Sequence, residues 1–329
     1  MKGLSIIVCC YNSVNRLQQT LAYLAGQITT NVPGIELIVV DNNSTDKTLT
    51  CAQEIWDRLN QPFEAFFLHE PNPGLTHARK KGIENAKYDY LIFCDDDNWL
   101  DKTYSETAYT YFESDPELAI LGGTGTAVFE QEKPYWFDQF YHGYAVGKQA
   151  PQTQYLNSVY GAGMALRKSV IISDQFNVVP LILNDRKGVS LSSGGDAEIC
   201  LRVRLLGYKI LYTDELTFKH FLTHSRLRWA YLKKLHDGFT EAYIPLHIYE
   251  LVMNGQKIGK FYWLQQSFLN FGRWIKYNIV YFNKIVGNDE GNTEAIRLRG
   301  WYILGIDFLR NNFKTNRIYK TILSIKQND

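Results

Sequence analysis

Three adjacent carboxylates are the residues of this chain whose types most directly suggest chemistry. Asp95, Asp96 and Asp97 follow Tyr90–Cys94, an apolar run with the length and continuity of a buried strand. Carboxylates held this close repel one another, and a divalent cation such as Mg²⁺ or Mn²⁺ would compensate them with hard oxygen ligands. The alternative is a solvated acidic turn without a ligand. Open α/β sheets bind ligands at the carboxyl ends of their strands, so the position favours the cation site.

A further carboxylate, Asp196, directly follows two glycines, Gly194 and Gly195. The glycines allow a close approach of the backbone, and a carboxylate within hydrogen-bond reach can take the proton of an attacking hydroxyl. Asp196 is therefore a candidate functional carboxylate. The alternative is that Asp196 and Glu198 are only first-turn acids that favour the helix dipole, with Glu198 paired to Arg202 four residues on.

Polar residues also follow the first two apolar runs. Tyr11 comes after Leu4–Cys10, and Asp41 comes after Ile35–Val40. Tyr11 could stack on a flat ring and Asp41 could accept hydrogen bonds from a base or a ribose, although strand-end packing and a turn would also explain them. Neither the dinucleotide fingerprint GxGxxG nor the P-loop pattern occurs at the expected places. A nucleotide bound here would therefore need a metal to hold its diphosphate.

The elements that must position these residues alternate regularly. We expect strands at 4–10, 35–40, 63–68 and 90–94, separated by helices at 15–24, 48–59 and 74–85. This alternation predicts βαβ units and a mostly parallel, doubly wound sheet flanked by helices. The polar residues after the strands would then meet at one edge of the sheet.

Composition supports a folded protein with an asymmetric charge. The chain has 329 residues, of which 45% are hydrophobic and 21% charged, enough for about two domains or for one domain with an extension. The net charge is +1, but 17 of the 35 basic and only 8 of the 34 acidic residues lie from Lys219 onward. The five cysteines show no CxxC spacing, which predicts neither disulfides nor a zinc site. No signal peptide and no apolar run of membrane-span length is recognised, so we expect a cytoplasmic protein.

Several segments, in this order, resemble glycosyltransferase family 2, whose members have the GT-A fold. They are 5–12 (SIIVCCYN), 39–46 (VVDNNSTD), 72–82 (NPGLTHARKKG), 95–97 (DDD) and 193–202 (SGGDAEICLR). Three positions depart from the family pattern: Cys9 replaces a usual Pro, Lys80 a common Asn, and Gly195 a frequent Glu. Each segment alone is weakly specific, whereas the ordered set, which spans about residues 4–225, is strongly specific.

The resemblance implies a role for each matching residue on the donor side. Tyr11 and Asp41 would hold the nucleobase, with Asp41 reading a uracil-type imide. Arg79 would support the base or the phosphates. Asp95 would contact the ribose, or the metal through water.

The resemblance likewise implies the metal ligands and the base. Asp97 would bind the Mn²⁺ or Mg²⁺ ion that bridges the diphosphate, and His220 would complete this site, with His224 as a rival ligand. Asp196 would be the general base.

The resemblance also implies an architecture and an activity. Residues 1–225 would form a GT-A catalytic domain, with a nucleotide-sugar half at about 1–120 and an acceptor half at about 121–225, and residues 226–329 a helical, basic and aromatic region. The activity would be inverting transfer of a hexosyl or N-acetylhexosaminyl group from a nucleotide-diphosphate sugar, UDP-sugar favoured. The acceptor would be a hydroxyl of a saccharide or lipid-linked molecule, in bacterial surface polysaccharide or glycan assembly. No motif for nucleic acid is present.

An apolar stripe at helical spacing runs through residues 257–286, beside basic and aromatic side chains. Its members are Phe261, Leu264, Phe268, Phe271, Ile275, Ile279 and Phe282. Such a stripe suits peripheral contact with anionic lipid at the inner face of a membrane. Packing on the catalytic domain, or on a second subunit of a homo-oligomer, are the alternatives. Residues 177–193 are expected to form a loop that leads into the acceptor-side motif.

Two other classes of protein remain open. A sugar nucleotidyltransferase also uses a nucleotide, a metal and clustered acids, but it needs a basic phosphate-gripping loop after the first strand, which residues 11–15 (YNSVN) do not provide. A non-catalytic sugar-binding protein of the same fold would have no need to retain both Asp97 and Asp196.

Overall fold

The first half of the chain has the predicted alternation of strands and helices. The computed structural model describes residues 1–183, 193–259, 261–282, 289–310 and 312–326. Its first elements are β1 (Leu4–Cys10), α1 (Leu17–Ala25), β2 (Ile35–Asp41), α2 (Thr48–Arg58), β3 (Glu64–His69), α3 (Leu75–Asn85) and β4 (Tyr90–Asp95). Every boundary lies within two residues of its predicted position. Of the predicted loop 177–193, residues 184–192 lie outside the described residues.

The chain from Asn98 to Leu222 adds shorter and more irregular elements. They are β5 (Asn98–Leu100), α4 (Tyr104–Ser114), β6 (Leu118–Phe129), β7 (Gln154–Tyr155), β8 (Ala165–Arg167), α5 (Lys168–Ile171), α6 (Asp174–Asn177), α7 (Gly195–Leu205) and β9 (Lys209–Leu222). Among the described residues the strands form one sheet in the order β3-β2-β1-β4-β8-β6-β9-β5, with β7 paired to β9. The pairs from β3 to β4 are parallel, whereas β8 and β5 run antiparallel to their neighbours.

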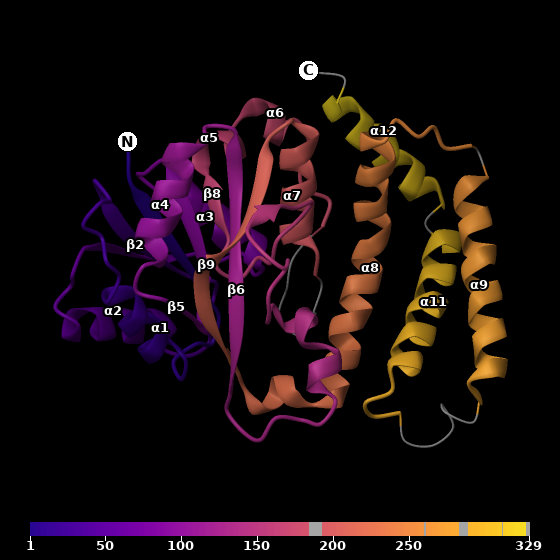
Figure 1. The fold of residues 1–329 in the computed structure, drawn as a ribbon, viewed down its shortest axis with the longest axis horizontal. Coiled ribbons are helices and arrows are strands. Elements are labelled where there is room, and N and C mark those ends of the chain that lie inside the picture. The colour runs from indigo at the N-terminus through magenta and orange to yellow at the C-terminus, as the bar shows by residue number, and fades with distance from the viewer. Residues whose placement is uncertain (184–192, 260, 283–288, 311, 327–329) are drawn as a thin grey trace.

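Helices cover both faces of the sheet, which explains the unbroken apolar strands. Along β1, Leu4, Ile6 and Val8 pack under α1, α2 and α4, while Ile7 points to the opposite face with α3 and α7. Strands buried on both sides are fully apolar rather than alternating. Figure 1 shows the sheet between these helix layers.

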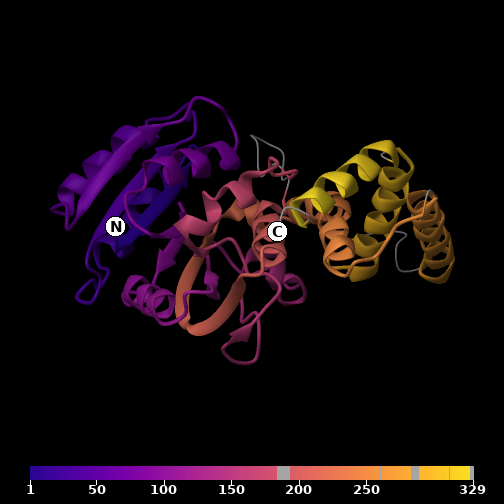
Figure 2. The ribbon, with the colours of Figure 1, turned by 90° about the horizontal axis from the view of Figure 1, so that it is seen from above.

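The C-terminal region is a group of helices beside the sheet. It consists of α8 (Trp229–Met253), α9 (Tyr262–Val280), α11 (Thr293–Arg310) and α12 (Asn312–Lys326). Figures 1 and 2 show α8 next to the sheet domain and α9 at the far side of the group. None of the helices that the structure describes is both long and apolar enough to cross a bilayer.

Candidate active site

The strand register brings the predicted donor-side residues to one edge of the sheet. Cys10 of β1 lies opposite Asp41 of β2, and Cys9 lies opposite Asp95 of β4. Tyr11, Asp41 and Asp95 therefore stand at the carboxyl ends of three adjacent parallel strands. This is the edge at which open α/β sheets bind ligands.

Asp41 has one carboxylate oxygen in contact with protein and one available. Its side chain is buried, and Oδ2 lies 3.2 Å from Nδ1 of His69, which ends β3. Oδ1 is buried without a hydrogen-bond partner. A buried acceptor left unpaired costs free energy, so this oxygen is suited to an N–H donor that arrives with a ligand. That Asp41 reads an imide, as the resemblance implied, stays a prediction.

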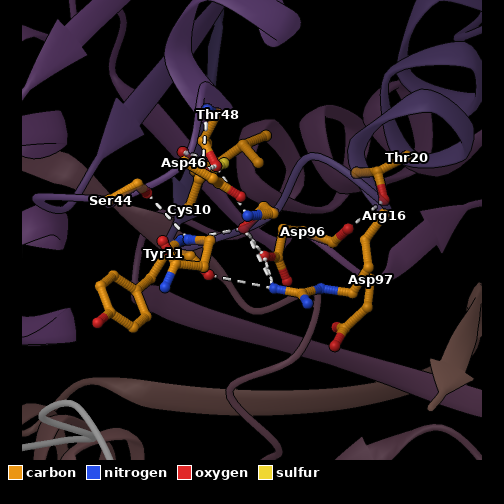
Figure 3. A network of polar contacts seen from close by, with 12 residues as sticks. Cys10, Tyr11, Arg16, Thr20, Ser44, Asp46, Thr48, Asp96 and Asp97 are labelled. Carbon is orange, nitrogen blue, oxygen red and sulfur yellow. Dashed lines mark hydrogen bonds and ion pairs between the residues drawn. The ribbon is translucent and has the colours of Figure 1, made fainter.

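Tyr11 is exposed after the end of β1, whereas the side chain of Asp96, after β4, is held by hydrogen bonds. The ring of Tyr11 is 45% exposed and points away from the polar network in Figure 3, so it is free to stack on a ligand. Asp96 accepts hydrogen bonds from Ser13 Oγ and, at 2.6 Å, from Arg16 Nη2. Its backbone carbonyl accepts from Thr20 Oγ1 at 2.8 Å. Asp96 therefore ties the loop after β4 to the loop and helix after β1.

Asp97 and His220 lie side by side, as the resemblance implied. His220 of β9 pairs with Asn98 of β5, the residue after Asp97, and Nε2 of His220 is 3.5 Å from Oδ1 of Asp97. The rival His224 is exposed and contacts Gln131 and Arg228 instead. The β5–β9 pairing is what joins residues that are more than a hundred positions apart in sequence.

The tautomer of His220 follows from its two partners. Nδ1 lies 2.7 Å from the carbonyl oxygen of Tyr144, which can only accept, so this nitrogen carries the proton. Nε2 then carries a lone pair, with which it accepts from Nη1 of Arg226 at 3.1 Å. An imidazole fixed by a backbone carbonyl in this way is the usual arrangement of a metal-binding histidine.

Arg226 is a site residue that the sequence reasoning missed. Its Nη2 lies 2.7 Å from Oδ2 of the buried Asp97, so the guanidinium bridges both predicted metal ligands. Burial acts to lower the pKa of Arg226, but Asp97, then Tyr231 and the carboxylates of Asp96 and Asp95, outweigh it and raise that pKa. The guanidinium is therefore a permanent positive charge within the acidic site.

Asp97 and His220 together offer ligand atoms that suit a divalent ion, although two side chains are a small set of ligands. Carboxylate oxygen and imidazole nitrogen are ligands that Mn²⁺ accepts, and both atoms here are directed at one cationic group. Within the described residues, no group of three or more His, Cys, Asp or Glu side chains is close enough to hold a metal. A bound ion would need its other ligands from water and from the substrate, as is usual for ions that bind phosphates.

Asp196, the second residue of α7, is held by a contact that the sequence did not predict. Its Oδ1 forms an ion pair with Nη1 of the buried Arg79, and its carboxylate fits against Gly161, where any Cβ would collide with it. The Arg79 guanidinium also stacks on the ring of Phe93, two residues before Asp95, at 4.7 Å from the ring centroid. Arg79 therefore connects the candidate base to the strand that carries the acidic residues. Its predicted contact with the nucleotide stays a prediction.

The comparison with known families decides where this arrangement belongs. Residues 5–173, just over half of the chain, match the sequence model of glycosyl transferase family 2. The chain belongs to glycosyl transferase family 2. The resemblance found in the sequence segments is thereby confirmed.

Relatives of this family 2 chain include enzymes with different named activities. A glucosyl-dolichyl phosphate glucuronosyltransferase of Haloferax volcanii is 24% identical over 257 residues, which cover 74% of this chain and 77% of that protein. A poly-β-1,6-N-acetyl-D-glucosamine synthase of Staphylococcus epidermidis is 29% identical over 124 residues, 37% of this chain and 28% of that protein. The glycosyltransferase GlyA of Streptococcus pneumoniae is 22% identical over 73% of this chain. The family 2 chain spans no more than a third of the length of the last two proteins.

Solved structures confirm the fold of this glycosyltransferase family 2 member. TarS 1–349 of S. aureus superposes with a TM-score of 0.52 at 16% identity, covering 100% of this chain and 92% of that one. GalNAc-T7 with UDP, GalNAc and Mn²⁺ superposes with a TM-score of 0.53 at 13% identity, covering 76% of this chain and 51% of that one. At these identities the likeness establishes the fold alone, and the fold is the predicted GT-A architecture with a helical C-terminal extension.

The family 2 chain also has a buried polar network directly behind Asp196. Glu198 and Arg202 form the predicted i,i+4 ion pair at 3.2 Å, and both side chains are almost fully buried. Glu198 also accepts from the backbone N–H groups of Ile182 and Leu183 and from the hydroxyl of Tyr249 in α8. This network joins three parts of the chain: the helix that carries the candidate base, the segment before residue 184 and the C-terminal helices.

Part of the aromatic segment 134–144 lies in the interior. Trp136, Phe137, Phe140 and Tyr144 are buried in one cluster with Trp229 of α8. These residues form the surface on which the N-terminal half of α8 packs.

The cysteines near the site are buried, protonated thiols. Burial is the main cause that raises the pKa of the Cys94 thiol well above its ordinary value, and the carboxylates of Asp95, Asp97 and Asp96 raise it further. Cys94 and Cys10 therefore stay protonated, as is usual for buried cysteines that pack as small apolar residues.

Proposed function

We propose that this chain is an inverting glycosyltransferase that moves a hexosyl or N-acetylhexosaminyl group from a nucleotide-diphosphate sugar, UDP-sugar favoured, to a hydroxyl. The acceptor would be a saccharide or a lipid-linked molecule, in bacterial surface polysaccharide or glycan assembly. The observation that supports this most strongly is the position of Asp196. It is a partly exposed carboxylate that a buried Arg79 holds next to the strand bearing Asp95–Asp97.

The donor nucleotide is proposed to bind over the ends of β1 and β2. The exposed ring of Tyr11 would stack on the base, and the unpaired Oδ1 of Asp41 would accept from the imide N–H of uracil. The half-buried Asp95 would contact the ribose. The choice of UDP is supported by the solved complex of TarS 1–349 with UDP-GlcNAc, which shares this fold.

The diphosphate is proposed to lie beside Asp97 and His220. These two residues would hold a divalent ion, Mn²⁺ or Mg²⁺, which supplies Lewis-acid stabilisation of the leaving diphosphate when bound. The Mn²⁺ complex of GalNAc-T7 supports this proposal. Asp95 would reach the ion through water.

Asp196 is proposed to take the proton of the acceptor hydroxyl as that oxygen attacks the anomeric carbon. A hydroxyl is a weak nucleophile, and proton transfer to a positioned carboxylate typically contributes 10²–10⁴-fold. Arg79 orients the carboxylate, and Gly161 leaves room for it. With one base opposite the leaving group, the displacement inverts the sugar, so an α-linked donor gives a β-glycoside.

Nucleotide binding tests the donor half of the proposal. Isothermal titration of the purified chain with UDP, CDP, GDP and dTDP should show UDP as the tightest ligand. Replacing Asp41 by Asn should weaken UDP binding about tenfold or more, because hydrogen bonds to charged groups contribute about 1.5–3 kcal/mol. The same change should reduce the preference for UDP over CDP, since cytosine has an acceptor in place of the imide N–H.

Glu64→Gln is the matched control for the Asp41 variant, because it also removes one carboxylate charge, at the start of the neighbouring strand β3. It should leave UDP affinity unchanged. If Asp41→Asn binds UDP as the wild type does, the proposed reading of the base by Asp41 is wrong.

The exposed face of α9 is proposed to contact anionic lipid. Its apolar side chains Phe268, Ile275 and Ile279 are between 53% and 74% exposed, with exposed Arg273 and Lys276 on the same helix. The opposite side of α9 packs on α11, where Phe271 lies against Gly305. Apolar and basic residues together on a helix surface suit an anionic membrane. Lys260, Lys284 and the rest of 283–286 lie outside the described residues.

Liposome flotation tests the α9 proposal. The full chain should float with vesicles that contain an anionic phospholipid, and the double variant Phe268→Glu, Ile279→Glu should not. Ile172→Glu is the control, because Ile172 is an apolar residue that is 54% exposed outside the C-terminal helices, and this variant should float. If the wild type does not float, and the double variant instead dissociates a dimer in solution, the face is an interface between copies.

A further inference from the structure

Arg226 lies where a cation would bind to the acidic site. Its guanidinium donates from Nη1 to His220 Nε2 at 3.1 Å and approaches Asp97 Oδ2 with Nη2 at 2.7 Å. These atoms belong to the two residues that the proposed function gives to a divalent ion. One cationic group therefore already contacts both residues.

The two arginines near the acidic residues, Arg16 and Arg226, form ion pairs with different aspartates. Arg16 pairs with Asp96 and contacts Ser13 and the Tyr11 carbonyl, but no contact with Asp97 or His220 is among its hydrogen bonds. Arg226 contacts Asp97 and His220, and its side chain is 18% exposed. Arg226 belongs to the 3₁₀ turn His224–Leu227, which comes after β9, so its side chain enters the site from the C-terminal side. The contact with Asp97 is thus made by a segment that joins the sheet to α8.

We propose that the Arg226 guanidinium is the resident cation of this site, and that a divalent ion binds Asp97 and His220 only by displacing it. This inference rests on the metal site of the proposed function. Two cations cannot share a position about 3 Å from the same oxygen and nitrogen, and they also repel each other strongly where water is scarce. The free energy of metal binding is then the difference between the interaction of Asp97 and His220 with the ion and their interaction with Arg226. The enzyme would bind metal weakly on its own, because each binding event must first break the ion pair between Arg226 and Asp97.

Competition between Arg226 and a metal ion predicts whether metal affinity rises or falls when the guanidinium is removed. If breaking the ion pair opposes metal binding, removing the guanidinium must tighten metal binding by the same free energy. Coupling free energies between two ligands are typically 1–3 kcal/mol, equivalent to about 5–150-fold in affinity. A residue that only helped to form the metal site would have the opposite effect.

Binding of Mn²⁺ to the nucleotide-free full chain tests the proposal, measured by isothermal titration and by the loss of the free Mn²⁺ paramagnetic resonance signal. Arg226→Gln should bind Mn²⁺ at least about fivefold more tightly than the wild type. Arg16→Gln is the matched control, because it removes the same charge from the same acidic cluster without freeing Asp97 or His220. Its effect should be clearly smaller than that of Arg226→Gln. Far-ultraviolet circular dichroism and thermal melting would verify that both variants are folded.

Two results would overturn the proposal. One is Mn²⁺ binding by Arg226→Gln that is no tighter than in the wild type, including no binding at all. The other is an equal gain in Arg16→Gln, which would show a general charge effect. Titration of the same samples with UDP distinguishes this failure from failure of the proposed function, because UDP binding through Tyr11 and Asp41 does not require Arg226.

Discussion

Asp196→Asn should lower the turnover number for sugar transfer by about 10²–10⁴-fold, the usual contribution of a positioned general base. Asparagine keeps the size of the side chain and can still accept from Arg79, but it cannot take a proton from the acceptor hydroxyl. UDP affinity should change little, because Asp196 lies on α7 and the nucleotide is proposed to bind over β1 and β2. Steady-state transfer rates and a UDP titration would measure the two quantities separately.

Asp174→Asn provides the control for that loss. Asp174 is an exposed first-turn acid of α6, so its replacement removes the same charge from the acceptor half of the chain without touching the Arg79 contact. Its transfer rate should be that of the wild type. Transfer by Asp196→Asn at a rate within threefold of the wild type would contradict the assignment of Asp196 as the base.

Glu198→Gln should lower the free energy of unfolding by about 3–5 kcal/mol, the range for removing one partner of a buried ion pair. The change leaves the guanidinium of Arg202 without its carboxylate in an interior where both side chains are 1% exposed or less. It also weakens the acceptor for the Ile182 and Leu183 N–H groups and for the Tyr249 hydroxyl. Urea unfolding, followed by circular dichroism and by tryptophan fluorescence, would measure the loss.

A surface pair with the same spacing gives the matched control. Lys80 and Glu84 are also four residues apart on a helix, but their side chains are 73% and 57% exposed and their charged atoms 3.8 Å apart. Glu84→Gln should change stability by less than about 1 kcal/mol. The double variant Glu198→Leu, Arg202→Met should lose less free energy of unfolding than the sum of the losses of its two single variants, since neither charge remains unpaired. An equal effect of Glu198→Gln and Glu84→Gln would contradict the role given to the buried network.

The parallel half of the fold was predictable because its signals are local. Continuous apolar runs such as Leu4–Cys10 mark strands that are covered on both faces, and the helices between them have regular apolar spacing. The strand-end residues Tyr11, Asp41 and Asp95 could be placed for the same reason. In a parallel sheet, knowing the strands is enough to know which edge their carboxyl ends share.

The second half of the sheet was less predictable because its pairing is not local. Glycines 122, 123 and 125 lie inside β6, where Gly122 and Gly123 make room for Val159 and for the Leu216 carbonyl. Glycine weakens a strand locally, and only the tertiary contact explains its presence there. Helix α8 likewise runs to Met253, through Pro245, because its second half is buried against α7 and α12.

Candidate site residues could be named from the sequence, but the contacts between them could not. Types and order in the sequence indicated Asp97, His220 and Asp196. Neither indicated that Arg79 would hold Asp196, nor that Arg226 would bridge Asp97 and His220. Arginine occurs at many surface positions, so its partner becomes known only when the fold has brought the charges together.

The most direct test of the proposed function is turnover of a panel of nucleotide sugars by the purified chain, with Mn²⁺ and a set of saccharide and lipid-linked acceptors. Nucleoside diphosphate release would be quantified, and the anomeric configuration of the product determined by nuclear magnetic resonance. We expect release of UDP from an α-linked UDP-sugar, formation of a β-glycoside, and loss of both in Asp196→Asn. Release of a nucleoside diphosphate from none of the donors, or a product that retains the α configuration, would contradict the proposal.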